Sequence, residues 1–410
     1  MKYKTKVLVI GYVWAEPNSS AAGSHILSIM QLFQKQNWQV EFATPAQESE
    51  HAIDLKSIGI STQNISLNCD SFDTYVKAYK PDIVIYDRFM MEEQFGWRVA
   101  KNCPNALTIL DTEDLQCLRN ARHQAHKANR KMNQTDLFSN LAKREIAAIL
   151  RCDLSLIIST FEMELLINTF KIDPTLLHHL PFMVELEKLP KTTKPFSERQ
   201  HFMTIGNFRH APNWDVILHL QEIWTEIRKK LPKAELHIYG SYPPPKATAL
   251  HNPKKGFHIK GWADSVHEVM EQSRICLAPI RFGAGIKGKL LYAMITQTPS
   301  VTSSLGSEGM HDQEPWAGMV ADNVEDFVEA AVKLYTDEEA WNKAQKHGTA
   351  LLHSRYNSKI LGQDLIEKIK EVQKNLEQHR LNNFTGAMLK HHSMMSTKYM
   401  SQWINEKNKK

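Results

Sequence analysis

The residues whose types and spacing point most directly to chemistry follow the short apolar run Ile275–Pro279. They are three glycines and three basic residues within nine positions: Arg281, Gly283, Gly285, Lys287, Gly288 and Lys289. Glycines let a backbone approach a ligand, and a helix that opens after such a turn presents free N–H groups and a positive dipole. This composition predicts a diphosphate site with Lys287 exposed in the turn. A tight turn with solvated lysines is the structural alternative.

The same glycines also satisfy GxGxxG, the pattern of dinucleotide-binding turns. That fingerprint belongs to the first strand–helix turn of a domain, with an acid at the end of the following strand. Here the first turn, Gly11–Trp14, lacks it, and Ser303 and Ser304 stand where the acid would be, with Glu308 beyond them in a loop. A sugar nucleotide is therefore favoured over NAD. An NAD-dependent oxidoreductase and a sugar-nucleotide epimerase stay as alternatives.

A second group of candidates is acidic and follows the apolar run Leu107–Leu110. Carboxylates occupy positions 111, 113 and 114. At the carboxyl end of a buried strand, such groups are placed for general-base work or substrate binding. Asp111 and Glu113 are therefore the catalytic candidates on this side, with helix capping as the alternative. Asp87 and Arg88, after the preceding run, form a weaker candidate of the same kind.

The loop after the first apolar run is rich in serine and alanine, from Trp14 to His25. Small residues permit close approach of a ligand, and the hydroxyls can hydrogen-bond to it. Ser20, Gly23 and His25 are its candidate acceptor-site residues. His25 and His210 are the histidines expected near a ligand, with ordinary polar surface as the alternative for each.

The elements that must position these residues are short apolar runs alternating with longer helical patterns, which is typical of a parallel sheet with helices on both faces. The expected strands of the first half are Val7–Gly11, Val40–Thr44, Ile83–Tyr86, Leu107–Leu110 and Leu154–Ser159. Those of the second half are Phe202–Gly206, Glu235–Gly240, Phe257–Lys260, Ile275–Pro279 and Ser300–Ser303.

A polar stretch with two prolines, Glu185–Pro195, separates the two series and is expected to be a linker. The predicted fold is α/β, with two Rossmann-like doubly wound domains, 1–188 and 195–355, facing a central cleft. Ligands of such sheets lie outside the carboxyl ends of the strands, so both domains would contribute loops to the cleft.

The last segment, 356–410, should begin with a long charged helix, Ser358–Arg380. The remainder is polar, methionine-rich and basic. A disordered tail, a helix lying back on the first domain and a partner-docking segment all stay open for it, and a surface helix or tail is favoured over a membrane anchor.

Composition narrows the class of protein. The formal net charge is +5 over 410 residues, and no basic stripe with interleaved aromatics points to nucleic acid. The five cysteines never form a CxxC pair, which argues against a disulfide framework and a zinc site. No apolar run is long enough to span a bilayer, and no signal peptide is evident. We therefore expect a cytoplasmic protein.

Three motifs in Phe202–Asp322 resemble the donor domain of GT-B glycosyltransferases, most closely glycosyltransferase family 4 (glycosyl transferases group 1). They are Ile205–Asn213, Leu236–Gly240, and the glycine–lysine turn with its continuation through Thr298–Thr302 and Gly306–Met310. The first domain resembles the acceptor half only in its rhythm of strands and helices.

The resemblance implies a metal-independent, retaining transferase without a cofactor. It would move sugar from a nucleotide-sugar donor to a hydroxyl of a glycan, lipid-linked or protein acceptor in glycan or glycoconjugate synthesis. Peripheral membrane contact stays open. The resemblance also implies that the C-terminal helix, Ser358–Arg380, returns toward the first domain. Asp111 would lie beside the reacting sugar, and Lys287 would stabilise the leaving group. The implied donor-binding residues are Gly206, Asn207, Arg209, Asn213, Arg281, Gly283, Gly285, Lys287, Lys289, Tyr292 and Glu308.

One position departs from the family pattern. The usual pair of acids, eight positions apart, would fall near Ala284 and at Tyr292, and neither is acidic. The second acid ordinarily holds ribose hydroxyls, which Tyr292 could contact only through its phenol. An unusual donor, or a degenerate transferase fold that acts as a binding protein, follows as an alternative.

Overall fold

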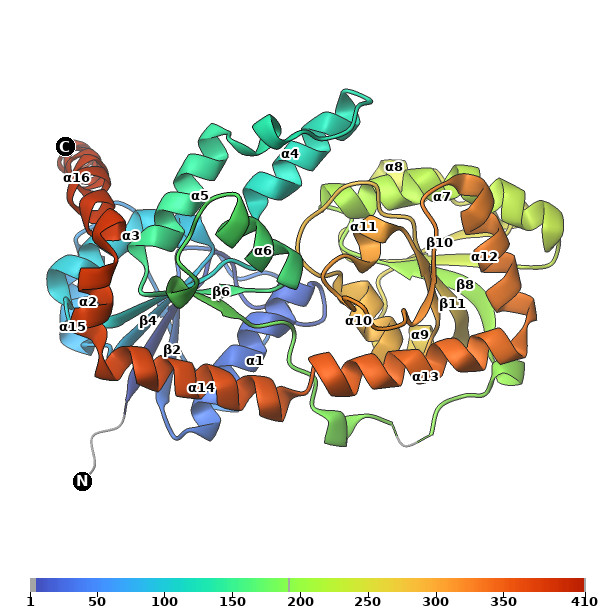
Figure 1. Cartoon of the computed structure of the whole chain (residues 1–410), viewed down its shortest axis with the longest axis horizontal. Helices are drawn as coiled ribbons and strands as arrows, with labels where there is room; N and C mark the ends of the chain where they lie inside the picture. Colours follow the sequence, from blue (N-terminus) through green and yellow to red (C-terminus); the bar gives the residue numbers. More distant parts are fainter. Residues whose placement is uncertain (1–4, 191, 409–410) are drawn as a thin grey trace.

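The computed structural model describes residues 5–190 and 192–408, and it contains two parallel β-sheets, each covered by helices (Figure 1). The expected α/β fold with two Rossmann-like domains is confirmed. The expected linker runs between the two sheets, and its Lys191, like Met1–Lys4, lies outside the described residues.

The first sheet has seven strands in the order β3-β2-β1-β4-β5-β6-β7. Every neighbouring pair is parallel. The strands are β1 (Lys6–Ile10), β2 (Gln39–Thr44), β3 (Ser61–Asn64), β4 (Ile83–Asp87), β5 (Leu107–Asp111), β6 (Leu154–Ile157) and β7 (Leu177–His179).

The second sheet has six parallel strands in the order β10-β9-β8-β11-β12-β13. They are β8 (Gln200–Ile205), β9 (Leu236–Tyr239), β10 (Phe257–Gly261), β11 (Ser273–Ala278), β12 (Ser300–Thr302) and β13 (Gly318–Val320). In both sheets the chain order reverses beside the first strand of the domain, and the crevice at that reversal is where such folds bind ligands.

Helices connect the strands and cover both faces of each sheet. In the first domain they are α1 (Ala21–Lys35), α2 (Ser71–Tyr79), α3 (Phe89–Asn102), α4 (Gln116–Lys127), α5 (Asn140–Arg151) and α6 (Thr160–Asn168). In the second they are α7 (Ala211–Lys230), α8 (Pro245–Thr248), α9 (Val266–Gln272), α10 (Gly288–Ile295), α11 (Ser304–Ser307), α12 (Val324–Thr336) and α13 (Glu338–Arg355).

Successive side chains of β1 pack on opposite faces of the first sheet and belong to two separate apolar clusters. Val7 and Val9 pack with the helix α1, while Leu8 and Ile10 face the side covered by α2, α3, α4 and α5. Successive side chains of a strand point to opposite faces, so a continuous apolar run suits a strand that is buried on both.

The C-terminal segment crosses back to the first domain. α14 (Ser358–Lys374) continues from α13, and its Leu365, Ile366 and Ile369 join the core that contains Val7 (Figure 1). The expected helix Ser358–Arg380 is interrupted at Asn375, after which come α15 (Leu376–Asn382) and α16 (Phe384–Asn408). α16 packs against α3 and α5.

Three strands lie outside the sequence prediction: β3, β7 and β13. Each is short and lies at an edge of its sheet or next to one, and β3 (Ser-Thr-Gln-Asn) carries no apolar run. Within the described residues, no helix is long and apolar enough to cross a membrane.

Candidate active site between the two domains

A cavity of about 670 Å³ lies between the two domains. Its walls include the loops that follow β1, β4 and β5 in the first domain and β8, β9 and β11 in the second. The candidate residues that line it are Ser20, Arg88, Glu113, Gly206, Asn207, Arg209, His210, Asn213, Gly283, Gly285, Lys287, Gly288, Lys289 and Tyr292. Gly23, His25, Asp111, Arg281 and Glu308 are not among its lining residues.

The glycine turn after β11 is pressed against the first domain. A Cβ added to Gly285, whose φ is +63°, would lie 2.9 Å from Cβ of Asp114. A Cβ added to Gly288 would lie 2.4 Å from Cβ of Ala21. Glycine is therefore required here for close approach between domains as well as for backbone conformation.

Lys287 is the N-cap residue of α10, and its side chain is only 9% exposed. The expectation of an exposed lysine is therefore wrong, because the turn is covered by the first domain. The Lys287 ammonium donates a hydrogen bond to the carbonyl of Gly285 at 2.6 Å. Burial lowers the pKa of Lys287 to about 8, and burial lowers that of Lys289 likewise to about 8.

Neither lysine forms an ion pair within the described residues. The more distant carboxylates of Glu308, Glu162 and Asp114 nevertheless favour the charged form of Lys287. Both lie at the first turn of α10, where backbone N–H groups are free and the helix dipole is positive. Cations held out of water without a carboxylate partner are costly, and an anionic ligand would offset that cost.

The loop between β8 and α7 forms another wall. Gly206 makes room for the Asn213 amide, whose Cγ would lie 2.6 Å from a Cβ at that position. Asn213 donates to the carbonyl of Asn207 at 3.1 Å, so its amide holds this turn. The Arg209 guanidinium lies 3.6 Å from the centroid of the Tyr242 ring.

Arg281 and Glu308 are engaged elsewhere. The Arg281 guanidinium donates to both carboxylate oxygens of Asp215, at 2.9 and 2.6 Å. Glu308 accepts two hydrogen bonds from Arg122 at 2.8 Å each. The structure thus uses both as ion-pair partners at the rim instead of presenting them to the cavity.

Tyr292 lies on α10, at the position where the family pattern has an acid. Its hydroxyl is 2.9 Å from Oγ of Ser24, which lies on α1 of the other domain. The phenol therefore links the two walls of the cavity at this point.

Below the first-domain wall lies a buried group of ionisable side chains from three elements. Nδ1 of His25, on α1, is 3.8 Å from a carboxylate oxygen of Asp111 and 3.8 Å from one of Glu113. Asp87, at the end of β4, accepts a hydrogen bond from the Tyr12 backbone at 3.0 Å. Of these four side chains only Glu113 reaches the cavity.

The ionisable side chains of this group shift one another's pKa values. Burial lowers the pKa of His25, but the facing carboxylates of Asp111, Glu113 and Asp87 outweigh it and raise the pKa to about 9. Burial, followed by the charge of Glu113, raises the pKa of Asp111 to about 7. Glu113 also has φ of +60°, a strained conformation for a non-glycine residue and one that recurs at functional sites.

Ligand atoms of His25, Asp111 and Glu113 lie within 4.8 Å of one another, so these residues could also hold a metal ion. Both nitrogens of His25 and one oxygen of each carboxylate have no hydrogen-bond partner in the described structure. A proton shared within the group, ordered water or a cation would each satisfy them.

In the acceptor loop, Ser20 and Gly23 shape the start of α1. Ser20 is its N-cap residue and accepts a hydrogen bond from the Gly23 backbone at 3.0 Å. Gly23 lies against the backbone of Glu16, where a Cβ would approach the carbonyl oxygen to 2.5 Å. Ser20 still lines the cavity, so the cap and the ligand site coincide.

Two first-domain residues that sequence reasoning missed reach the glycine turn. Glu162 is fully buried and accepts hydrogen bonds from the backbones of Leu115 at 3.0 Å and Gly285 at 2.9 Å. Arg122 donates to the carbonyl of Gly283 at 2.9 Å. The only local signal was Ser159–Glu162, which reads as a capping box and gives no hint of a contact with the other domain.

Comparison with known proteins finds a family that matches the second domain and solved structures that share the fold of the whole chain. Residues 199–337 match the glycosyl transferases group 1 family. A comparison with curated proteins found no match.

Among solved structures, sucrose-phosphate synthase from Thermosynechococcus elongatus is 14% identical with a TM-score of 0.65, covering 90% of this chain and 99% of that one. TarM from S. aureus, in a complex with UDP, is 10% identical with a TM-score of 0.69, covering 90% and 99%. HepE from Anabaena, in complex with UDP and glucose, is 11% identical with a TM-score of 0.66, covering 89% and 99%.

These likenesses agree with the two parallel sheets of the structure. The second domain thus matches the glycosyl transferases group 1 family, and the chain as a whole has the GT-B fold of solved glycosyltransferases.

Proposed function

We propose that the protein transfers a sugar from a nucleoside-diphosphate sugar to a hydroxyl group of a glycan or glycoconjugate. The observation that carries this proposal is the pair Lys287 and Lys289 at the first turn of α10, which line the cavity and form no direct ion pair in the described structure. Two cations at a helix N-terminus suit a diphosphate, whose charge grows when the glycosidic bond breaks.

The donor is proposed to lie along the second-domain wall, with its diphosphate at Lys287 and the glycine turn. The solved structures of TarM and HepE, which are complexes with UDP, support a nucleotide-bound donor. Arg209 and Asn207 border the same cavity and are placed to contact the rest of the donor. Tyr292 lies where a ribose-binding acid is usual, so we expect the ribose to be held by fewer hydrogen bonds.

The acceptor hydroxyl is proposed to approach Glu113, since this carboxylate opens onto the cavity from the opposite wall. Asp111 and His25, behind it, would hold the carboxylate in place and tune its charge. We propose retention of configuration on the resemblance to group 1 enzymes alone.

We propose that transfer needs no metal ion, because the two lysines and the α10 dipole can supply the positive charge at the leaving group. Full activity in the presence of a chelator is expected, and loss of activity restored by a divalent cation would overturn this part.

The cytoplasm is the proposed location, because all five cysteines are free thiols, as expected in a reducing compartment.

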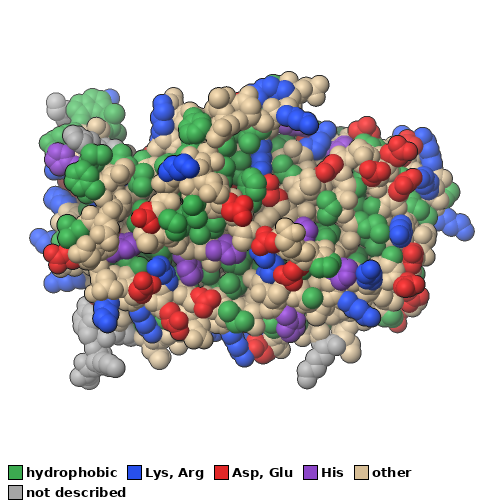
Figure 2. Space-filling view, in the orientation of Figure 1, with side chains coloured by type: hydrophobic (Ala, Val, Ile, Leu, Met, Phe, Trp, Pro, Cys, Tyr) green, Lys and Arg blue, Asp and Glu red, His purple; other side chains and the backbone are tan. Residues whose placement is uncertain are grey.

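We further propose that α16 brings the enzyme to an anionic lipid surface. Its exposed side chains include Phe384, Met388, Tyr399, Met400 and Trp403, and the ammonium groups of Lys398 and Lys407 lie over the rings of Tyr399 and Trp403. Figure 2 shows hydrophobic side chains gathered over this helix, at the upper left. Apolar and basic groups together on one surface helix suit an interface that carries negative headgroups.

Co-sedimentation with vesicles tests this surface. Binding to vesicles with anionic lipid, and its loss in Tyr399→Ser/Trp403→Ser, is expected. Equal binding by that variant, or a stable complex with a second protein copy at this face, would contradict it.

The experiment for the transfer itself is a thermal-shift panel of UDP-, GDP- and ADP-sugars with NAD as comparison, followed by detection of the released nucleotide. Stabilisation by one nucleotide sugar and its turnover with a glycan acceptor are expected. Stabilisation by NAD alone would replace the transferase with an oxidoreductase or epimerase, and binding without turnover would indicate a degenerate binding protein.

A further inference from the structure

A group of metal-ligand side chains lies on the second domain, away from the cavity. His201 lies near the start of β8, Glu235 directly precedes β9, His237 lies within β9, and His258 is in β10. These are the amino-terminal ends of parallel strands, whereas the cavity lies at their carboxyl ends. None of the four residues lines the cavity.

The pairing of the strands places the group on one face of the sheet. His237 is in register with Met203 on one side and His258 on the other. Glu235 lies two residues before His237 and therefore points to the same side. His201 has a φ of +62°, and its place beside them rests on its distance to Glu235 and on the stacking of its ring with that of His237. Further along, this face is covered by the apolar cluster under α9 and α10, so the group occupies its uncovered end.

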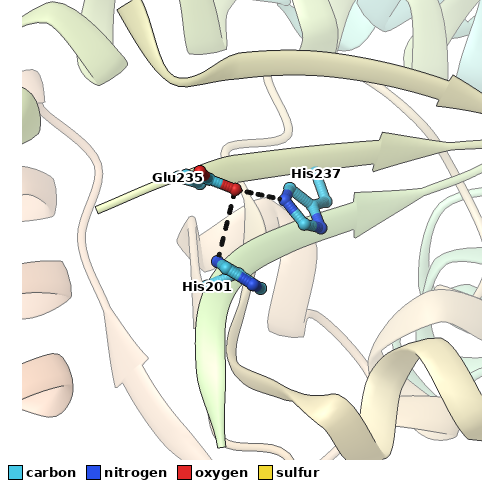
Figure 3. A group of neighbouring side chains, drawn as sticks. All are labelled: His201, Glu235 and His237. Carbon is cyan, nitrogen blue, oxygen red and sulfur yellow. Dashed lines mark hydrogen bonds and ion pairs between the residues drawn. The ribbon is translucent and has the colours of Figure 1, made fainter. Parts of the chain in front are cut away.

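The side chains converge on one carboxylate oxygen. Oε2 of Glu235 is 2.9 Å from Nε2 of His237, 3.6 Å from Nδ1 of His201 and 3.6 Å from Nε2 of His258. Ligand atoms of the first three residues lie within 4.8 Å of one another, and Figure 3 shows their side chains directed toward one another from neighbouring strands. Tetrahedral Zn²⁺ with bonds of about 2.0–2.1 Å separates its ligands by roughly 3.3 Å.

Hydrogen bonding within the group does not account for this convergence. Only His237 is within hydrogen-bond distance of Glu235, and Nε2 of His258 is buried without a partner in the described structure. The rings of His201 and His237 are stacked, with centroids 4.2 Å apart, and a ligand atom of each lies within 4.8 Å of one of Glu235. A cation would satisfy the carboxylate and several nitrogens at once.

We propose that His201, Glu235 and His237 bind a divalent transition-metal ion such as Zn²⁺, with His258 as the fourth ligand. Imidazole and carboxylate ligands suit this class of ion better than Mg²⁺ or Ca²⁺. Four protein ligands leave no open position, which is typical of a structural site. The ion would tie β8, β9 and β10 together at the end where no helix covers them.

The test uses the full chain after removal of metal by a chelator, with Zn²⁺ as the only addition. One equivalent per chain should bind, measured by competition with a chromophoric chelator, and the melting temperature should rise by about 5 °C at saturating Zn²⁺. The double variant His201→Asn/His237→Asn should bind at least about 100-fold more weakly. The matched control is His353→Asn, an exposed histidine on α13, which should bind like the wild type.

The buried group His25, Asp111 and Glu113 is the competing place for the ion, and His25→Asn separates the two. Retained Zn²⁺ affinity in the double variant, or its loss in His25→Asn, would overturn the proposal. If the double variant does not fold, the Co²⁺ absorption spectrum of the wild type decides, with a tetrahedral spectrum expected and an octahedral one contradicting it. Metal removal should lower the melting temperature without lowering the initial rate of sugar transfer, so this site and the transfer are tested separately.

Discussion

The two walls of the cavity carry opposite chemistry on the same architecture. At the strand ends of the first domain lie carboxylates, with Asp111 and Glu113 beside His25. At those of the second lie Lys287 and Lys289, which form no direct ion pair in the described structure. Each wall is suited to one half of a transfer, the first to a hydroxyl that must lose a proton and the second to phosphates that gain charge. Each domain can supply one kind of charge because loops of both domains line the same cavity.

The largest effect should come from the first wall. Glu113→Gln keeps the shape of the side chain but removes its charge and basicity, so kcat should fall by about 100-fold or more. Donor affinity should be unchanged, because the donor is assigned to the other wall. Steady-state kinetics and nucleotide titration measure the two quantities. Glu164→Gln, at an exposed residue on α6, is the control. A matching loss of donor affinity in Glu113→Gln would contradict the assignment of acceptor and donor to opposite walls.

Lys287→Ala tests the second wall. Its contact should be stronger in the transition state than in the ground state, so kcat/KM should fall on the order of 100-fold, about 3 kcal/mol. The melting temperature should change little, because the substitution relieves the burial of the ammonium but also gives up its attraction to Glu308, Glu162 and Asp114. Lys343→Ala, an exposed lysine on α13, should behave like the wild type. Near-normal turnover in a folded Lys287→Ala/Lys289→Ala variant would show that the donor site lies elsewhere.

Removing a contact between the two domains should reduce activity less than removing a charged side chain from either wall of the cavity. Arg122→Met removes the bridge from α4 to Glu308 and to the carbonyl of Gly283, so the donor KM should rise about tenfold while kcat changes little. Arg130→Met is the matched control, because Arg130 makes a similar double contact to Asp136 inside the first domain. An equal effect of the two substitutions on the donor KM would contradict the role assigned to the Arg122 contact between the domains.

The smallest effect concerns stability as a function of pH. The pKa of His25, raised to about 9, exceeds its unfolded value of about 6.5, so its contribution is present below that value and is lost as pH rises through 9. Asp111, with a pKa raised to about 7, also binds its proton more tightly in the folded state, so stability falls as pH rises toward 7. The melting temperature should therefore decline by several degrees between about pH 6 and 9.

Differential scanning fluorimetry of the wild type and His25→Gln measures this decline. The variant should show a flatter decline above about pH 6.5. The charged groups that face His25 are Asp87, Asp111 and Glu113, and none is altered by the substitution. An unchanged slope in the variant would mean that the buried group does not titrate as described.

Features that depend on residues close together in the sequence could be predicted, whereas contacts between distant segments could not. Central strands such as β1 and β4 are buried on both faces, so their apolar runs are visible in the sequence. The edge strand β3 has no such run. The glycine turn was recognised because its residues are contiguous, and the fold it implied is confirmed.

Contacts across the cavity could not be predicted in this way. Lys287 was expected to be exposed because nothing local covers it, but Ala21 and Asp114 of the other domain press against its turn. Arg122 and Glu162 carry no distinctive pattern, and their part in the site appears only once the two domains are placed face to face.

The central claim is that the α10 lysines, and not the first-domain acids, hold the donor diphosphate. The most direct test is calorimetric titration of the best-stabilising nucleoside diphosphate into three proteins: the wild type, Lys287→Ala/Lys289→Ala and Glu113→Gln. The lysine variant should lose at least about tenfold in affinity, as expected for lost charge-assisted contacts, while Glu113→Gln should bind like the wild type. Equal affinity in the lysine variant and the wild type, with both folded, would contradict the account.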